Sequence, residues 1–381
     1  MDLLEYQGKR FLADYGVPVP KGGVAESAQE AVAWAEGIGY PVAVKAQVHI
    51  GGRGKAGGIV VAANPTEVRS AAERILGMDI RGHVVKCLLI EKGSEIEAEY
   101  YAGFTLDRSA GGYLGMLSAQ GGVDIEAVAE TAPEAISRIL VNPVEGLTEA
   151  TIASWVRFAR IDDRATHPTI RILSDLYAAF VHGDADLIEI NPLVLTSAGE
   201  VLALDAKVTL DSNSVFRHPN YQDFDATQPR DDREAAAHSR GLQYVGLDGT
   251  VGVIANGAGL AMSTVDVIAQ AGGAAANFLD IGGAAEVETM ASALEVINND
   301  PRVKVIFINI FGGIVQGDVV ARGILAALDR VKLRSPIVLR LDGTNAAEGR
   351  AMIGNRLSER LVMADSMPDG AMRAVEIAGR T

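Results

Sequence analysis

The amino-acid sequence predicts an α/β protein with two domains, and three observations support this fold class. The chain has 381 residues, which is more than one hydrophobic core comfortably holds. It contains 42 glycines, and many of them form short clusters after apolar runs, where α/β proteins place ligand-binding loops. In the last third of the chain, apolar segments alternate with helical patterns, which is typical of a parallel sheet covered on both faces.

The first part of the chain is expected to mix helices and strands. A helix is predicted over residues 2–15, with Asp2 as its N-cap and Gly16 beyond its end. The segment 217–240 is polar and contains prolines, so it is the predicted connection between the domains. Further strands are predicted at 41–48, 84–91, 100–106 and 112–118, and two helices within 148–183.

The second part follows a more regular plan of strand, small-residue loop and helix. Five such units in about 140 residues favour a flavodoxin-like or Rossmann-like domain. The predicted domains are therefore residues 1–235 and 240–381. The predicted strands of the second domain are 251–255, 275–280, 303–310, 336–341 and 360–364.

Residues 186–195 and 201–208 are predicted to form a hairpin around a five-residue turn. If the turn is symmetric, Asn191 lies opposite Asp205, because side chains repeat on one face every second position. Directly opposed Cβ atoms are about 4.5–5.5 Å apart. An amide oxygen and a carboxylate at that separation suit Mg²⁺, which also binds water and phosphate oxygens.

The same symmetry places Glu189 opposite Lys207 on the face that carries Asn191 and Asp205. An ordinary edge hairpin with a surface Glu–Lys pair is the alternative interpretation of this pattern. The hairpin alone does not decide between a metal site and a structural edge.

A glycine-rich loop at 49–58 follows the predicted strand that carries Lys45. Its successive backbone N–H groups can form a nest for an anion, and Lys45, Arg53 and Lys55 add positive charge. A flexible basic hairpin tip is the alternative. The loop lacks the Walker A pattern, so a P-loop NTPase is unsupported.

Acidic residues gather where the predicted strand at 84–91 ends, from Glu91 to Glu99. They could accept hydrogen bonds from a ribose or an adenine amine, although such a run is more often a solvated surface. In the second domain, glycine loops at 256–259, 282–283 and 312–313 follow three strands. Such loops gather at the carboxyl edge of a parallel sheet, where ligands bind, although close helix packing also explains glycines there.

Composition excludes several function classes. The net charge of −15 argues against nucleic acid and anionic membranes as partners. No apolar stretch reaches membrane-spanning length and no signal peptide is visible, so we expect a soluble cytoplasmic protein. Cys87 is the single cysteine, so no internal disulfide is possible. No histidine lies in 240–381, and no Ser–His–Asp arrangement is visible.

Six motifs occur along the chain in this order: Leu4–Gln7, His49–Gly58, Glu189–Leu193, Leu204–Lys207, Asn256–Leu260 and Asn309–Ile314. Together they resemble the β subunits of succinate–CoA ligases, and the resemblance covers nearly the whole chain. It implies an ATP-grasp N-terminal half, with a lid subdomain at about 20–100, followed by a flavodoxin-like CoA-ligase domain.

The resemblance implies a reversible reaction of the tricarboxylic acid cycle. A nucleoside triphosphate (ATP or GTP), succinate and CoA give succinyl-CoA, the diphosphate and phosphate. An α subunit is the implied partner, and it carries the phosphohistidine and the CoA site. Malate–CoA ligase uses a similar β chain and is the nearest alternative. A stand-alone ATP-grasp ligase and a non-catalytic nucleotide-binding chain are the others.

The resemblance also implies roles for residues at matching positions. Glu189 is the implied catalytic acid that meets the phosphohistidine loop. One Mg²⁺ per chain is implied on Asn191 and Asp205. The implied nucleotide contacts are Lys45, Gly52, Arg53, Gly54, Glu91, Ser94 and Glu99. The implied substrate contacts are Asn256, Gly313, Ile314 and Val315.

Overall fold

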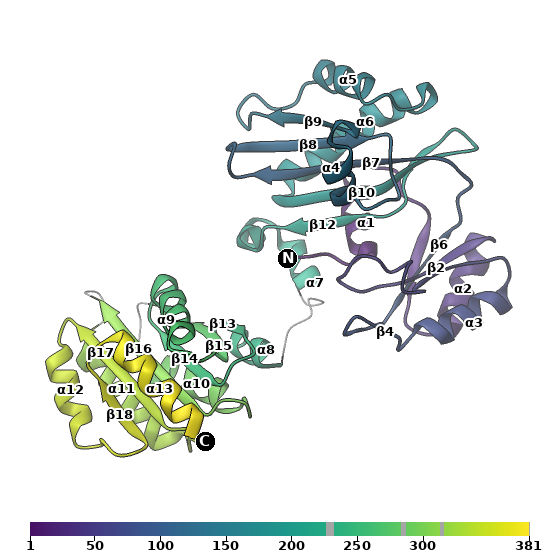
Figure 1. Cartoon of the computed structure of the whole chain (residues 1–381). Coiled ribbons are helices and arrows are strands. Elements are labelled where there is room, and N and C mark those ends of the chain that lie inside the picture. The colour runs from purple at the N-terminus through teal and green to yellow at the C-terminus, as the bar shows by residue number, and fades with distance from the viewer. Residues whose placement is uncertain (226–231, 283–286, 313–315, 381) are drawn as a thin grey trace. The chain divides into compact units, whose positions relative to one another are not determined.

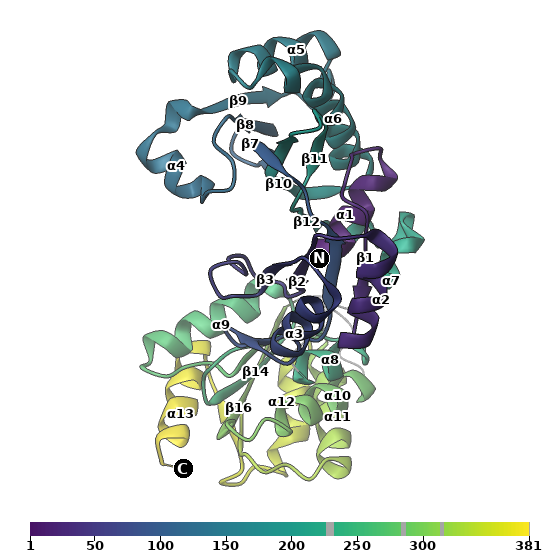
Figure 2. The same cartoon turned by 90° about the vertical axis from the view of Figure 1, so that its right-hand side faces the viewer.

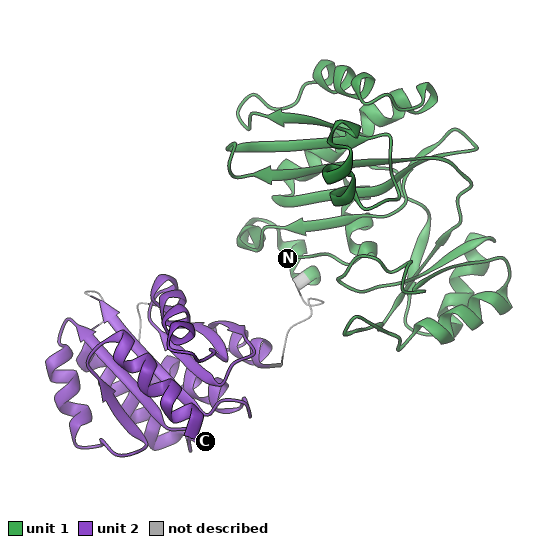
Figure 3. Cartoon of the chain, in the orientation of Figure 1, with its two compact units in different colours: residues 1–229 green, residues 230–381 purple. Residues whose placement is uncertain are grey.

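The computed structural model describes residues 1–225, 232–282, 287–312 and 316–380. The chain divides into two compact units, residues 1–229 and 230–381 (Figure 3). This division lies inside the polar segment 217–240. None of the helices in the described part of the chain combines the length and the apolar character that a membrane span requires.

Unit 1 contains a four-stranded sheet of order β1-β6-β2-β3, which α2 and α3 cover. Ser27 caps α2 and Asn64 caps α3, because each side chain accepts the N–H of the residue three positions on. A small ribbon of β4 (Asp79–Ile80) and β5 (His83–Val84) precedes β6. The bounds of the sheet and its helices are β1 Gly22–Ala25, α2 Ala28–Ile38, β2 Val42–Ala46, β3 Ile59–Ala62, α3 Pro65–Ile75 and β6 Leu88–Lys92.

A larger sheet of order β11-β10-β7-β8-β9 completes unit 1, and β12 also pairs with β10. The helices α5 and α6 lie along one face of it (Figure 1; Figure 2 gives the view turned by 90°). Trp155 and Phe180 of these helices pack against Phe104 of β7 in the main core. The bounds are β7 Ile96–Asp107, β8 Gly112–Ser118, α4 Ile125–Thr131, β9 Ile136–Val141, α5 Glu149–Phe158, α6 Asp163–His182, β10 Ala185–Thr196, β11 Val201–Ala203, β12 Lys207–Leu210 and α7 Gln222–Asp225.

The first helix, α1, spans Glu5–Asp14, so the predicted start at Asp2 is wrong. Residues 2 and 3 instead run beside β12, where the Leu3 N–H donates to the Val208 carbonyl oxygen at 2.9 Å and Asp2 forms a bridge with Thr209. Leu4 is the N-cap of this helix, and the Gln7 side chain accepts the Leu4 N–H at 2.9 Å. This start places Glu5 and Lys9 of α1 at the β10–β12 hairpin.

The predicted hairpin is confirmed. Leu193 pairs with Ala203 in the first part of the hairpin, and Glu189 pairs with Lys207 in the second. Between these parts the second arm leaves the ladder at residues 204–206. Asn191 and Asp205 therefore lie at an interruption of the pairing, in a register that still sets them opposite each other.

Unit 2 is a six-stranded sheet of order β13-β15-β14-β16-β17-β18, in which β13 alone of the described strands runs antiparallel. The helices α10, α11 and α12 cover one face and α9 and α13 the other. The bounds are α8 Asp232–His238, β13 Gln243–Gly246, β14 Val251–Ala255, α9 Ala258–Gln270, β15 Asn277–Asp280, α10 Val287–Asn298, β16 Val305–Gly312, α11 Gly317–Arg330, β17 Ile337–Gly343, α12 Ala346–Gly354, β18 Leu361–Ala364 and α13 Met367–Arg380.

The five strands predicted for this region are all present, with ends within two residues of the predicted ones. The edge strand β13 was not predicted, because its four residues contain only two apolar ones, Tyr244 and Val245.

Candidate functional site

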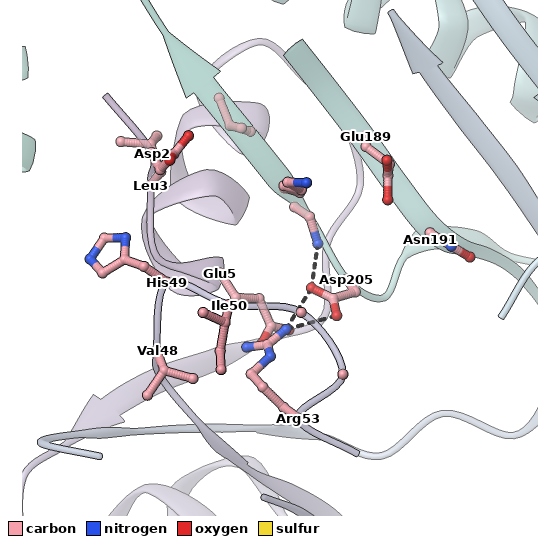
Figure 4. Close-up of a pocket in the computed structure, with 15 residues that line it drawn as sticks. Asp2, Leu3, Glu5, Val48, His49, Ile50, Arg53, Glu189, Asn191 and Asp205 are labelled. Atoms are coloured by element: carbon pink, nitrogen blue, oxygen red, sulfur yellow. Dashed lines mark hydrogen bonds and ion pairs between the residues drawn. The ribbon is translucent and has the colours of Figure 1, made fainter. Parts of the chain in front are cut away.

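A pocket of about 240 Å³ lies in unit 1 where three segments meet: the start of α1, the glycine-rich loop after β2, and the β10–β12 hairpin (Figure 4). Five of the predicted site residues line it, namely Gly52, Arg53, Glu189, Asn191 and Asp205. The complete lining is Asp2, Leu3, Glu5, Val48, His49, Ile50, Gly51, Gly52, Arg53, Glu189, Asn191, Asp205, Ala206, Lys207 and Val208.

A network of charged side chains lies beside and beneath this pocket, and we call it the charge cluster. Three cations and three carboxylates come from α1, β2, β6, the glycine-rich loop and the hairpin. Five of the six side chains are at most 8% exposed, whereas the Asp205 side chain at the pocket is 33% exposed. The charge cluster consists of Glu5, Lys9, Lys45, Arg53, Glu91 and Asp205.

The two lysines of the charge cluster share the same partners. Lys9 Nζ is 2.8 Å from Glu5 Oε1, 2.6 Å from Glu91 Oε2 and 2.7 Å from the Leu204 carbonyl oxygen. Lys45 Nζ is 3.0 Å from Glu5 Oε1 and 2.8 Å from the Leu204 carbonyl oxygen, and it forms an ion pair with Glu91 Oε1. The two buried carboxylates therefore hold two ammonium groups in common.

Arg53 connects the charge cluster to the hairpin. Its Nη1 donates to Glu5 Oε2 at 2.5 Å, and its Nη2 donates to both oxygens of Asp205, at 2.9 and 2.7 Å. Figure 4 shows the guanidinium between these carboxylates at the wall of the pocket. The predicted cation of the glycine-rich loop is thus brought to the predicted metal ligand of the hairpin.

Two groups of the charge cluster, Glu5 and Lys45, are kept ionised by their charged neighbours. Burial on its own raises the pKa of Glu5, but the charges of Lys9, Lys45 and Arg53 outweigh it and hold that pKa well below its ordinary value. Burial on its own lowers the pKa of Lys45, but Glu5, Glu91 and Asp205 outweigh it and raise that pKa. Both groups therefore stay charged at neutral pH.

Glu189 lies on the same face of the hairpin as Asp205 but is not part of the charge cluster. The Tyr101 hydroxyl donates to Glu189 Oε2 at 3.3 Å, and Lys207 pairs with Glu189 across the ladder. Burial raises the pKa of Glu189, with further contributions from the negative charges of Glu126 and Asp205, and these outweigh the opposing effects of Lys207 and Tyr101. This half-buried carboxylate thus binds a proton more readily than an ordinary glutamate does.

The two predicted metal ligands line the same pocket but have different partners. The Asn191 amide accepts the Gly122 N–H at 2.8 Å and donates to the Val123 carbonyl oxygen at 2.8 Å. Asp205 accepts from Arg53 and from the N–H of Ala206. No group of three or more His, Cys, Asp or Glu residues in the described ranges could hold a metal ion. One carboxylate and one amide oxygen suit Mg²⁺, which takes few protein ligands.

The structure does not bring every predicted residue to the pocket wall. Lys45 and Glu91 are buried in the charge cluster, whereas Gly54 is exposed at the tip of its loop. Ser94 and Glu99 are half-buried and lie outside the lining, with Glu99 paired to Val194 in the larger sheet.

No role was predicted for Glu5 or Lys9 from the sequence. The sequence does contain a pattern that indicates their burial, because they are four residues apart in a helix and flanked by the apolar residues Leu4, Phe11 and Leu12. A charged pair on the apolar face of a helix requires buried partners.

In unit 2, three loops meet at the carboxyl edge of the sheet, as predicted. Asn256 after β14 accepts the Phe311 N–H at 2.9 Å and donates to the Phe311 carbonyl oxygen at 2.8 Å. Asp280 at the end of β15 accepts the N–H groups of Gly257 and Gly282, at 2.6 and 2.7 Å. The predicted substrate contacts Gly313, Ile314 and Val315 lie outside the described residues.

Comparisons with known proteins agree on both halves of the chain. Residues 2–195 match the family model of the ATP-grasp domain, and residues 254–366 match that of the CoA-ligase. A solved structure of ATP citrate lyase from Methanothrix soehngenii, in complex with citrate and coenzyme A, has a TM-score of 0.80 and 18% identity. It covers 98% of this chain and 99% of its own, and at this identity it supports the fold alone.

Curated relatives share far more of the sequence. The "Succinate--CoA ligase (ADP-forming) subunit beta" of Rubrobacter xylanophilus is 49% identical over 378 residues, which are 99% of both chains. The "subunit beta 2" of the same name from Streptomyces coelicolor is 47% identical over 380 residues, 99% of this chain and 97% of the relative. With both domain models matched in order, the chain belongs to the family of ADP-forming succinate–CoA ligase β subunits.

Proposed function

We propose that this chain is the nucleotide-binding subunit of an acid–thiol ligase that joins succinate to coenzyme A. A nucleoside triphosphate is consumed, and the diphosphate and phosphate are released. The observation that carries the proposal is the pocket of unit 1, which gathers Arg53, Glu189, Asn191 and Asp205 in a chain of this family. The malate–CoA alternative is not favoured, because the relatives at 47–49% identity are named for succinate.

The phosphates of the nucleotide are the charged part of the substrate, so cations must hold them. Arg53 lines the pocket and Lys45 lies in the charge cluster beside it, and both are positive at neutral pH. A charged donor forms a stronger hydrogen bond to a phosphate oxygen than a neutral donor does. Gly52, with a φ of +79°, allows the loop backbone to approach a phosphate without a side chain in the way.

Asn191 and Asp205 are the residues that would hold Mg²⁺. When bound, the ion supplies positive charge that offsets the charge of the phosphate oxygens during transfer. The donors fit this ion, because both are hard oxygen ligands on one pocket wall. In this proposal Arg53 releases Asp205 and donates to the phosphates, so that Asp205 becomes free for the cation.

The phosphoryl group is proposed to pass to a histidine of a second subunit and then to succinate. No histidine occurs in residues 239–381 of this chain, so a phosphohistidine in the second domain must come from a partner. Glu189 is proposed to orient that imidazole by accepting its N–H. Asn256, at the carboxyl edge of the sheet of unit 2, is proposed to serve the succinate end of the reaction. Residues 313–315 are proposed to serve the same end by their resemblance to the family.

Transfer of labelled phosphate tests the proposal. The chain is mixed with its co-purifying partner and ATP labelled at the γ position, and label is expected on the partner in an acid-labile form. Succinate with CoA is expected to discharge it, whereas malate with CoA is expected to discharge it poorly. A partner that never acquires label would contradict the proposed function.

Asp205→Ala tests the assignment of the metal ligand in the same assay. Phosphorylation of the partner is expected to fall at least about 100-fold, the size of effect that follows loss of one electrostatic group at a phosphoryl-transfer site. Glu200→Ala is the matched control, since Glu200 is an exposed acid of the same hairpin. Near-normal labelling with Asp205→Ala would remove Asp205 from the metal site.

A further inference from the structure

We infer that Lys9 is a positioning residue that lets Lys45 leave its buried partners and bind a phosphate. The inference rests on the proposed nucleotide site and adds a residue to it. Lys9 stands on α1, and its side chain is almost fully buried, at 6% exposed. Neither Lys9 nor Lys45 lines the pocket itself. Its proposed role is to compensate the charges of Glu5 and Glu91 while Lys45 is engaged with the nucleotide.

Lys45 has no donor to spare in this structure. An ammonium group has three N–H donors, and the Lys45 ammonium contacts three oxygens, those of Glu5, Glu91 and Leu204. A phosphate oxygen can therefore be bound only if Lys45 gives up at least one of these partners. Lys45 is the lysine placed to do so, because its strand β2 leads into the glycine-rich loop that carries Arg53.

The two carboxylates that Lys45 would leave are deeply buried. The side chains of Glu5 and Glu91 are each 1% exposed. A buried carboxylate that loses its partner is strongly destabilised, because no water replaces the lost charge. Without a second cation, the attraction of Glu91 would hold Lys45 in place and oppose nucleotide binding.

Lys9 and Arg53 remove that penalty. Lys9 contacts the same three groups as Lys45, at 2.8 Å to Glu5, 2.6 Å to Glu91 and 2.7 Å to the Leu204 oxygen. Glu5 also keeps Arg53 on its second oxygen. Glu91 has only the two lysines among its ion pairs in the described structure. Lys9 is therefore the group on which Glu91 depends once Lys45 moves.

The inference predicts a specific coupling between Lys9 and Glu91, which a double-mutant cycle measures. Binding of ADP with Mg²⁺ to the full chain is followed by calorimetry. Lys9→Gln is expected to weaken binding about tenfold, since Glu91 then retains Lys45. In a Glu91→Gln background the same change is expected to alter affinity less than about twofold, because no buried charge remains to be compensated.

Arg10→Gln is the matched control. Arg10 is the next residue of α1, is exposed, and carries the same charge as Lys9. Its removal is expected to leave the affinity for ADP unchanged. A tenfold loss in this control as well would attribute the effect to the net charge of the chain and would overturn the inference.

Three results would contradict the assignment. If Lys9→Gln binds ADP as tightly as the wild-type chain, Lys9 has no positioning role. If Lys9→Gln weakens binding equally in both backgrounds, its role is packing and not charge compensation. If the wild-type chain does not bind ADP with Mg²⁺, the proposed function itself fails, and the inference fails with it.

Folding of the single variant does not limit the test. The double variant Lys9→Gln with Glu91→Gln loses one charge of each sign, so it keeps the balance of the buried cluster. Comparison of this double variant with Glu91→Gln alone is sufficient: affinities within about twofold support charge compensation, and a tenfold difference overturns it.

Discussion

The two units hold their candidate ligand sites together by different interactions. In unit 1, three cations and three carboxylates form the charge cluster at the pocket, and their contacts cross from α1 to β2, β6 and the hairpin. In unit 2, the loops at the carboxyl edge are tied by backbone groups that hydrogen-bond to Asn256 and Asp280. In the proposed function the first kind of contact exchanges partners when a charged ligand binds, whereas the second kind holds the loops in place by hydrogen bonds.

This difference follows from the ligands that the sites are proposed to bind. A nucleotide with its metal ion brings several charges, and buried charges can meet them only if other charges balance the site beforehand. A helix N-terminus and neutral loops can stabilise an anion by oriented N–H groups, without any exchange of ion pairs. The comparison therefore predicts that charge removal damages unit 1 most, and that changes of shape damage unit 2 most.

The largest effect is expected from Glu5→Gln, which breaks the charge cluster. Three cations lose a partner in a buried site, so we expect a loss of about 3–5 kcal/mol in the free energy of unfolding of unit 1 at pH 7. Urea denaturation of the full chain measures it. Glu73→Gln is the control, because Glu73 is exposed on α3.

The pH dependence of this loss has a defined sign. The pKa of Glu5 in the folded chain lies well below its ordinary value of 4.5. The stabilising contribution of its charge is therefore fully present above pH 4.5 and disappears only as the pH falls through the lower folded value. The difference between wild type and Glu5→Gln should stay constant from pH 8 to pH 5 (about the range in which wild-type Glu5 is fully ionised). A difference below about 1 kcal/mol at pH 7 would show that the cluster contributes little to stability.

A change of shape in unit 2 is expected to have the next largest effect. A Cβ at Gly349 of α12 would lie 2.4 Å from the Gly317 carbonyl oxygen and 2.7 Å from Leu341 Cδ2. Gly349→Ala should therefore lower the stability of unit 2 by about 1–3 kcal/mol, because α11 and α12 must separate.

Gly354→Ala in the same helix is the matched control, since a Cβ there meets no atom within 4 Å. It should be neutral or slightly stabilising. Two measurements distinguish an effect on unit 2 from an effect on unit 1. In limited proteolysis, Gly349→Ala should make unit 2 more susceptible to cleavage. In an ADP-binding measurement, the affinity of this variant should be unchanged. Loss of ADP binding would contradict the independence of the two sites.

The sequence predicted much of the fold, because local periodicity carries that information. The hairpin pairing of Glu189 with Lys207 followed from alternation and turn length, and the strands of unit 2 followed from long apolar runs. Asp2 misled the prediction, since a residue that can cap a helix can also pair with a strand. Its partner Thr209 lies 207 positions away, beyond any local pattern.

The charge cluster could not be predicted from local pattern either. Lys45 and Arg53 were predicted as phosphate ligands, but the groups that hold them in place, Glu5 and Glu91, are 86 positions apart and meet only through the tertiary fold. Asn191 was predicted opposite Asp205, yet its amide is bound by the loop at Gly122. Ion pairs and loop contacts of this kind depend on which elements the fold brings together.

A smaller effect is expected from Asn256→Ala, which removes a neutral contact at the edge of unit 2. Two hydrogen bonds to the Phe311 backbone are lost, and water can replace them because the contact is exposed. The free energy of unfolding should fall by about 0.5–1.5 kcal/mol. Asn299→Ala, at an exposed position after α10, is the control. A loss of unfolding free energy as large as that expected for Glu5→Gln would contradict the proposed difference between the two units.

The smallest effect is expected from Glu189→Gln, and it has the opposite sign to that of Glu5→Gln. Burial raises the pKa of Glu189, so its charged form is disfavoured in the folded chain. The stability that its neutral form contributes is present below the ordinary pKa of 4.5 and is lost as the pH rises through the higher folded value. The Gln variant avoids this loss, so its melting temperature should exceed that of the wild type at pH 8, and the difference should shrink toward pH 4.5.

Melting curves from pH 4.5 to 8, with Glu200→Gln as the exposed control, test this expectation. Glu5 and Glu189, two carboxylates of unit 1, differ in their partners. Glu5 has three cations as partners, whereas Glu189 accepts a hydrogen bond from a hydroxyl and lies opposite one lysine, and it is proposed to serve the ligand site. Functional residues can lower the stability of a fold, so a stabilising Glu189→Gln would agree with this proposal. A Glu189→Gln variant that melts earlier at pH 8 would instead place Glu189 among the residues that support the fold.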